Sequence, residues 1–147
     1  MGEMDSLGNI HQVTMAIRDA VAPVFLITGI GSMLAVMTNR LGRAIDRARV
    51  LNEVAPEKRH KYQDELKIIV KRTKWLRRAI GMATLAALCV CISITSLFVG
   101  VELSLNVPHV VMLSFIVSMC SVIIGLLCFL REIVLASREV IVPFKHD

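Results

Sequence analysis

Few of the groups that carry enzyme chemistry are present in this sequence of 147 residues. Its four cysteines all lie in apolar runs and none forms a Cys-x-x-Cys pair, so we expect buried thiols rather than a metal site or a disulfide. The four histidines are scattered, and none can be grouped with a serine, a cysteine or a carboxylate into a catalytic arrangement. The sequence therefore predicts no catalytic residue, no metal, no cofactor and no enzymatic activity.

Aromatic residues are scarce, and charge is scarce within the apolar runs. One Trp and one Tyr give a basic surface little to stack on bases, so we expect no nucleic-acid partner. No acid or base lies inside the apolar runs proper, which argues against a proton-coupled transporter. The first 20 residues carry Glu3, Asp5 and Asp19 and no basic leader before an apolar run, so we expect no signal peptide.

Charge is abundant only in residues 39–78. This span holds thirteen of the seventeen Lys and Arg residues and five of the twelve acids, a local charge of +8 (thirteen minus five) in a chain of +5. Short spans rich in Lys and Arg beside membrane segments are retained in the cytoplasm. We therefore place residues 39–78 on the cytoplasmic side, with the N-terminus outside and the C-terminus in the cytoplasm.

Three apolar runs predict membrane-spanning helices at about residues 20–38, 79–101 and 107–130, because roughly 20 residues of helix cross a ~30 Å hydrocarbon core. Residues 1–8 are expected to be a tail before a helix capped by Asn9, and Pro23 can kink that helix. The predicted fold class is all-α, an integral membrane protein forming a single membrane domain over residues 1–147.

The basic span is predicted to be a cytoplasmic helical hairpin between the first and second membrane helices. Ala55-Pro56 interrupts it, because the residue before a proline avoids the helical region. Each arm carries an apolar seam with spacings of three and four, typical of packed helices. The seams are Leu41, Ala44 or Ile45, Ala48 and Leu51 in the first arm, and Tyr62, Leu66, Ile69, Thr73, Leu76 and Ile80 in the second. The second arm turns Lys67, Lys71, Lys74 and Arg78 outward.

Small and polar residues form further seams in the second and third spans. They are Ala79, Ala83, Ala87, Cys91 and Thr95, and Ser114, Ser118, Ser121, Gly125 and Cys128. Such seams let helices approach closely. Lipid offers no hydrogen-bond partner to the hydroxyls of Thr28, Ser32, Ser114 or Ser118, so we predict that the chain associates with itself as a homo-oligomer.

The first span suggests a pore in such an oligomer. One candidate pore-lining face recurs at spacings of three and four: Asp19, Ala22, Phe25, Gly29, Ser32, Val36 and Asn39. An inner basic face follows it, made of Arg40, Arg43 and Arg47. These arginines have three possible roles: contact with anionic lipid headgroups, a positive ring at the inner mouth of a pore, or docking of a soluble acidic partner.

Two functions are therefore considered. The first is a homo-oligomeric ion channel lined by the first helix. The alternative is a non-conducting membrane scaffold or sensor whose basic hairpin binds anionic lipid or a soluble partner.

Two stretches also resemble a known family. They are Ala22-Pro23-Val24-Phe25-Leu26-Ile27-Thr28-Gly29-Ile30-Gly31 and Thr38-Asn39-Arg40-Leu41-Gly42-Arg43-Ala44-Ile45-Asp46-Arg47-Ala48-Arg49. With them the chain, from residue 10 to about 135, resembles a bacterial family of small membrane proteins known only as a domain of unknown function. The resemblance implies a bacterial inner-membrane location, and it implies no activity and no site residue.

Overall fold

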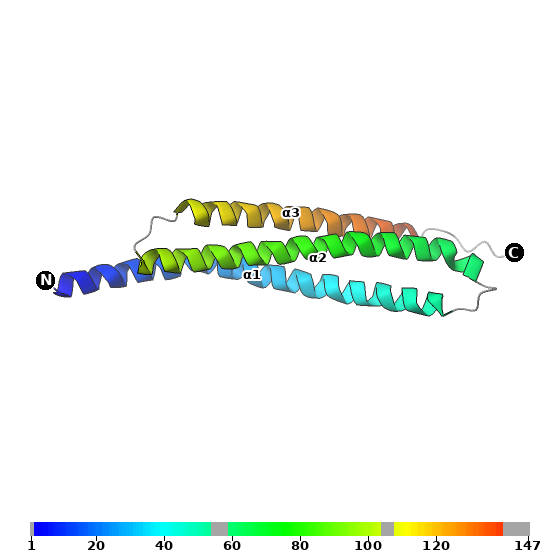
Figure 1. Cartoon of the computed structure of the whole chain (residues 1–147), viewed down its shortest axis with the longest axis horizontal. Helices are drawn as coiled ribbons and strands as arrows, with labels where there is room; N and C mark the ends of the chain where they lie inside the picture. The colour runs from blue at the N-terminus through cyan, green and yellow to red at the C-terminus, as the bar shows by residue number, and fades with distance from the viewer. Residues whose placement is uncertain (1, 54–58, 104–107, 140–147) are drawn as a thin grey trace. The chain divides into compact units, whose positions relative to one another are not determined.

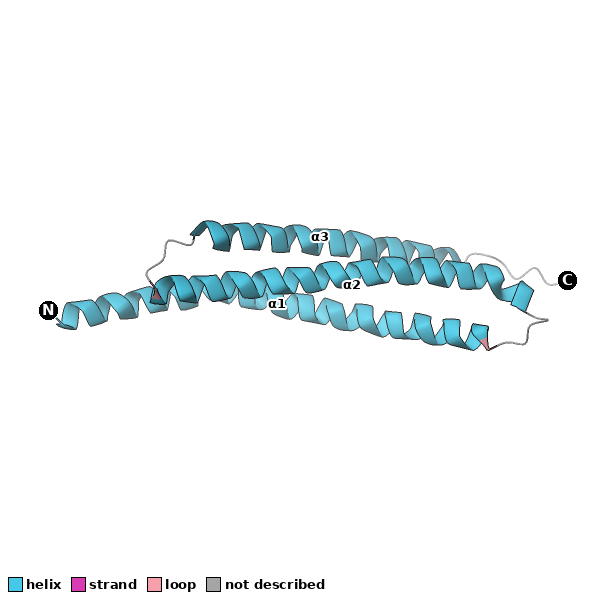
Figure 2. Cartoon of the chain, viewed as in Figure 1, coloured by secondary structure: helices cyan, strands magenta, loops and turns pink. Residues whose placement is uncertain are grey.

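The computed structural model describes residues 2–53, 59–103 and 108–139, and these residues form three helices (Figure 1). They are α1 (Gly2–Asn52), α2 (Arg59–Glu102) and α3 (Pro108–Glu139). Figure 2 shows helix in nearly all of the described residues and no strand among them. The all-α prediction is therefore confirmed.

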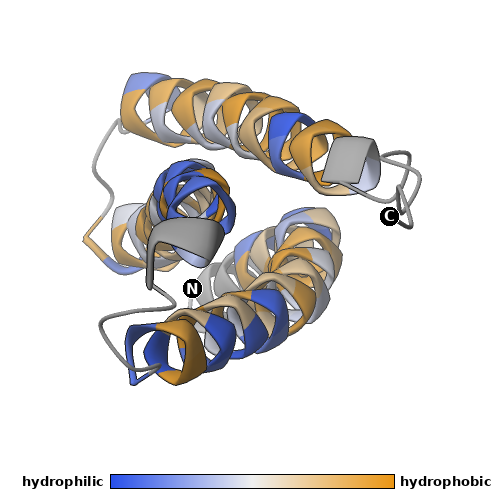
Figure 3. Ribbon diagram, turned by 90° about the vertical axis from the view of Figure 1, so that its right-hand side faces the viewer, coloured by the Kyte–Doolittle hydropathy of each residue, from blue (hydrophilic) through white to orange (hydrophobic). Residues whose placement is uncertain are grey.

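Each helix contains a stretch long and apolar enough to cross a membrane. The stretches are Ile10–Asn52, Tyr62–Glu102 and Pro108–Ser137, of 43, 41 and 30 residues. Figure 3 shows hydrophobic residues on all three helices. About 20 helical residues suffice for a hydrocarbon core, so α1 and α2 have length left over to extend beyond it. The three apolar helices are those expected of a membrane protein with three spans.

The start of α1 differs from the prediction. The helix begins at Gly2, so residues 2–8 are not a loose tail and Asn9 does not cap the helix. Pro23 lies inside α1 and does not end it. A proline removes one backbone donor, a smaller loss than the many helical hydrogen bonds on both sides provide. The predicted break at Ala55-Pro56 lies outside the described residues, as does most of the connection between the second and third predicted spans.

The chain divides into two compact units. The first comprises Met1–Ser32 and Thr84–Val122, and the second comprises Met33–Ala83 and Ile123–Asp147. Each helix contributes one segment to each unit.

In the first unit, serines join α2 to α3. The Oγ atoms of Ser93 and Ser114 lie 2.6 Å apart, and Ser118 donates to the backbone oxygen of Ala86 at 3.0 Å. Ser93 and Ser118 are buried, with 2% and 0% of their surfaces exposed. Hydroxyls hidden in this way are stabilising only because each has a partner.

In the second unit, all three helices contribute to an apolar core. Met37 of α1 packs with Leu76 and Ala79 of α2, and all three are almost fully buried. Cys128 and Phe129 of α3 pack against them. At Gly125 of α3 an added Cβ would lie 3.4 Å from the backbone oxygen of Ala79. A glycine here permits close contact between α3 and the α2 backbone.

The predicted small-residue seam is correct on α3 and partly wrong on α2. On α3, Ser118, Ser121 and Gly125 are buried, and Ser114 and Cys128 are half-buried. On α2 the far members, Cys91 and Thr95, are exposed. A spacing of four repeated along a helix of 3.6 residues per turn drifts around it, whereas alternating fours and threes stay on one face. The buried face of α2 has that alternation: Ala79, Ala83, Ala86, Val90 and Ser93.

The hydroxyl argument for an oligomer is also wrong. Thr28 donates to the backbone oxygen of Val24 at 3.1 Å, and Ser32 donates to that of Thr28 at 3.2 Å. Serines and threonines in helices can bond the carbonyl four residues earlier, which satisfies them without a second chain. Ser114 and Ser118 are likewise bonded within the chain.

The two segments rich in Lys and Arg, residues 39–52 of α1 and 59–78 of α2, are called the basic arms below. Their predicted seams face inward: Leu51, Ile69 and Leu76 are buried, with exposures of 5%, 5% and 1%. The remaining seam positions with described side chains are half-buried, except Ile45, which is 38% exposed. The predicted outward residues are all exposed: Lys67, Lys71, Lys74 and Arg78.

Candidate functional site

The second unit holds a buried carboxylate between two arginines. Glu132 of α3 is only 2% exposed. Arg72 of α2 donates to its Oε1 from Nε at 3.3 Å and from Nη2 at 3.1 Å. Nη1 of Arg40, on α1, lies 3.5 Å from the other oxygen, Oε2. One acid therefore links all three helices.

The two oxygens of Glu132 are held differently. Oε1 accepts charge-assisted hydrogen bonds, whereas Oε2 accepts none from the residues that the structure describes. The 3.5 Å contact between Arg40 and Oε2 is therefore an ion pair and not a hydrogen bond. A buried carboxylate is stable only when paired, and two guanidinium groups give this cluster a net charge of +1.

Two aromatic rings of the second unit contact arginines, and one of these arginines belongs to this cluster. The guanidinium of Arg40 lies 5.5 Å from the centre of the Phe129 ring. Trp75 of α2 receives two guanidinium groups, from Arg78 at 5.2 Å and Arg131 at 5.4 Å. Such contacts are favourable when the cation is partly desolvated.

Arginines also line a cleft of about 340 Å³ between the basic arms. Its lining residues are Arg40, Arg43, Ala44 and Arg47 of α1, and Glu65, Ile69 and Arg72 of α2. Glu65 is paired with Arg47, whose Nε and Nη2 lie 2.9 and 2.8 Å from its Oε1. We refer to this as the arginine cleft.

The predicted inner basic face is brought together in this cleft. Arg43 and Arg47 are exposed, but Arg40 is half-buried and directed towards Glu132 and Phe129. The sequence placed all three arginines on a face apart from the packed seam. Arg40 departs from that arrangement because Glu132 attracts it inward.

The candidate pore-lining residues all lie on α1 and all are exposed: Asp19, Phe25, Gly29, Ser32, Val36 and Asn39. Phe25 is 74% exposed and Val36 is 54% exposed. At 3.6 residues per turn, Asp19 and Phe25 differ by about 120° around the helix, so these two side chains point to different sides of α1.

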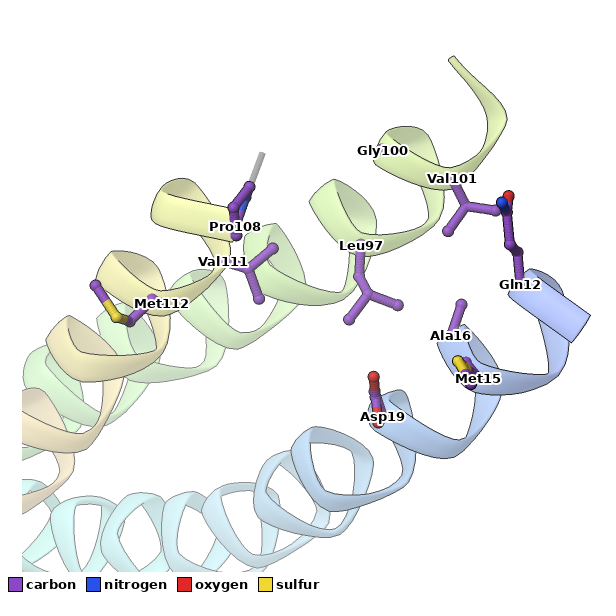
Figure 4. A pocket seen from close by; sticks show the side chains of 10 residues that line it. All are labelled: Gln12, Met15, Ala16, Asp19, Leu97, Gly100, Val101, Pro108, Val111 and Met112. Carbon is purple, nitrogen blue, oxygen red and sulfur yellow. The ribbon is translucent and has the colours of Figure 1, made fainter. Parts of the chain in front are cut away.

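Asp19 also lines a groove in the first unit (Figure 4). The groove has a volume of about 610 Å³, and Ala16 and Asp19 of α1 lie across it from Leu97 of α2. Most of its lining is apolar, with Gln12 and Asp19 as the polar side chains. Among the described residues no group of His, Cys, Asp and Glu could hold a metal ion.

Glu132 was missed by sequence reasoning, although a signal exists. It lies four residues after Cys128, and so continues the seam of Ser114, Ser118, Ser121 and Gly125 by one more step. An acid on the packed face of an otherwise apolar helix requires a cation opposite it. Its position directly after Arg131, at the end of the apolar run, is also typical of a solvated interfacial acid.

The family described as "Protein of unknown function (DUF2721)" matches residues 20–141. The chain belongs to this family. The match includes the arginine cleft and Glu132, and it confirms the resemblance noted from the sequence. No curated protein and no solved structure matches the chain.

Proposed function

We propose that the protein is a non-conducting scaffold or sensor of the bacterial inner membrane whose basic arms bind anionic lipid headgroups. The observation that supports this best is the exposed basic face of α2, formed by Lys67, Lys71, Lys74 and Arg78 immediately before the apolar part of the helix. In the described residues, the one ion pair on this face joins Lys67 to Asp64 at 3.1 Å. Arg78 lies over the Trp75 ring, and Lys71 and Lys74 have no ion pair or ring contact in the described residues.

The position of these charges suits a headgroup layer. At 1.5 Å per residue, Lys74 and Arg78 precede the apolar run by less than about 8 Å, within the depth of a headgroup region. Each basic residue near an anionic surface contributes about 1 kcal/mol. Trp75 lies between them, and tryptophan is enriched at membrane interfaces.

The proposed orientation has the arms in the cytoplasm and the N-terminus outside. Its support is the excess of Lys and Arg in the arms. A cysteine placed at Pro56 should be protected from an impermeant thiol reagent in intact cells, and one at Asn106 should be labelled. Both positions lie outside the residues that the structure describes. The reverse labelling would overturn the orientation, and the parent protein with its own four cysteines is the control.

Headgroup binding is tested in nanodiscs that mix phosphatidylcholine with phosphatidylglycerol. The protein should retain phosphatidylglycerol preferentially, measured by mass spectrometry of co-purified lipid, and Lys74→Gln should reduce the retention. Arg18→Gln, an equal loss of charge on an exposed residue in the N-terminal part of α1, is the matched control. Equal retention by both variants would overturn the proposal.

A homo-oligomeric channel lined by α1 is the second candidate. It is favoured by the exposure of large apolar side chains on the candidate pore-lining face of α1, with Phe25 at 74% and Val36 at 54%. In a pore these would be apolar constrictions, which gate by dewetting. Val36→Ser should then raise ion leak in liposomes, whereas Val24→Ser, exposed on a different face, should not. Arg43→Glu should change ion selectivity. Absence of conductance in every variant, or a monomer in mild detergent, would rule the channel out.

A further inference from the structure

We propose that the arginine cleft is a binding site for a phosphate group. Four of its lining residues are arginines, drawn from both basic arms, and one is an acid. Its volume of about 340 Å³ is at the small end of the range for ligand pockets, roughly 300–1,000 Å³. The cleft is therefore large enough for a phosphate or diphosphate group and too small for a helix of a partner protein.

The charges of the cleft are only partly balanced. Glu65 compensates Arg47, and Glu132, which lies behind the cleft, is shared by Arg40 and Arg72. Arg43 makes no ion pair and no ring contact with any residue in the described part of the chain. Four guanidinium groups and two carboxylates leave a net charge of +2, which matches a phosphate dianion.

The arginines are also held in place before any ligand arrives. Arg40 is fixed by Glu132 and by the ring of Phe129, and Arg72 by its two hydrogen bonds to Glu132. Arg40 contacts Glu132 through Nη1, and the planar fork of a guanidinium group suits phosphate oxygens. Fixing the side chains in advance lowers the entropic cost of binding. The buried acid thus positions the arginines, and the solvent-facing Arg43 supplies an uncommitted charge.

The inference deepens the proposed function because the same arms are involved, but binding to the cleft does not require membrane contact. The phosphate could belong to a lipid headgroup or to a soluble compound. Both sources present the same group to the arginines, so the experiment has to separate them.

The test is calorimetric titration of the full chain, in a neutral detergent, with inorganic pyrophosphate. Arg43→Gln should weaken the affinity about tenfold or more, the expected effect of losing one charge-assisted hydrogen bond. Arg49→Gln is the matched control, because Arg49 is an exposed arginine of the same arm that does not line the cleft. It should change the affinity less than about twofold. Circular dichroism checks that both variants remain helical.

Glu65→Gln gives an effect of opposite sign. It removes the carboxylate that competes for Arg47 without changing the side-chain shape, so pyrophosphate should bind several-fold more tightly. Unchanged or weaker binding by this variant would overturn the proposal. So would equal losses in Arg43→Gln and Arg49→Gln, or saturation by an acidic peptide and not by pyrophosphate.

Native mass spectrometry from mixed phosphatidylcholine and phosphatidylglycerol nanodiscs identifies the source. Bound phosphatidylglycerol that Arg43→Gln loses and Arg49→Gln keeps indicates a lipid headgroup. Pyrophosphate binding without such lipid indicates a soluble phosphate compound. If Lys74→Gln loses lipid and Arg43→Gln changes neither lipid nor pyrophosphate binding, the proposed headgroup contact stands and the phosphate site in the cleft is overturned. Failure of the headgroup proposal and failure of the cleft proposal are therefore distinguishable.

Discussion

Arg72 donates two hydrogen bonds to Oε1 of Glu132, a residue that lies 60 positions later in the chain. Both partners are largely hidden, with 21% of the Arg72 side chain and 2% of the Glu132 side chain exposed. This contact joins α2 to α3 at the same place where Arg40 joins α1 to α3. The stability of the second unit should therefore depend on a single carboxylate.

Glu132→Gln should destabilise the protein by roughly 3 kcal/mol, because it removes the buried carboxylate that two partly buried guanidinium groups contact. The expected result is a lower thermal midpoint in detergent, followed by circular dichroism. The control replaces the whole group at once, with Glu132→Leu, Arg72→Met and Arg40→Met together. An apolar replacement of a buried ion cluster is often neutral, so the triple variant should recover most of the loss. If Glu132→Gln alone were as stable as the parent, the ion pairs would contribute little to stability.

Ile69→Asp should separate the basic arms. Ile69 is 5% exposed, and burying an unpaired carboxylate there costs several kcal/mol. Limited proteolysis should cut this variant faster than the parent. Its neighbour Ile68 is 38% exposed, so Ile68→Asp should leave the cleavage rate nearly unchanged. Equal cleavage of the two variants would mean that the arms do not pack through this seam.

Gly125→Leu should push α3 away from α2, because a Cβ at this position already lies 3.4 Å from the Ala79 oxygen and 3.5 Å from Cβ of Met82. Overpacking of this kind costs typically about 1–3 kcal/mol. Gly125→Ala adds only a methyl at ordinary contact distance and gains helix propensity, so it should be tolerated. Gly81→Leu is the control, since nothing lies within 4 Å of a Cβ there. The thermal midpoint distinguishes the three variants.

Ala83→Leu tests the corrected face of α2. Ala83 is fully buried, whereas Cys91, eight residues later in the predicted seam, is exposed. The first substitution should lower the thermal midpoint and the second should not, because only the first lies against another helix. An equal fall in the thermal midpoints of Ala83→Leu and Cys91→Leu would show that both residues lie on one packed face, as the sequence predicted.

The periodicity of apolar residues predicted which face of a helix is buried, because that property depends on the sequence of the helix itself. The α3 seam and the arm seams were correct because their alternating fours and threes identify a buried face directly. The α2 seam drifted away from the buried face because small residues happen to recur every four positions there. Small side chains permit packing but do not require it, so their spacing alone does not show which face is covered.

Contacts between helices were less accessible from the sequence. Nothing local distinguishes Arg40, which is directed inward, from Arg43, which is exposed, because the difference depends on Glu132 some ninety residues away. The hydroxyl of Thr28 could likewise donate either to a second chain or to the backbone oxygen of Val24. The sequence does not distinguish the two, and the structure shows the bond to Val24.

The acid between the arginines is also the last of the three charged residues to be synthesised. Until Glu132 emerges, Arg40 and Arg72 present like charges to each other on neighbouring arms, and like charges repel most strongly where water is excluded. We therefore expect the basic arms to pack more firmly once the chain has been translated past residue 132. We expect a chain interrupted after Leu130 to expose its arms to protease, and protection equal to that of the parent would show that the arms close without this acid.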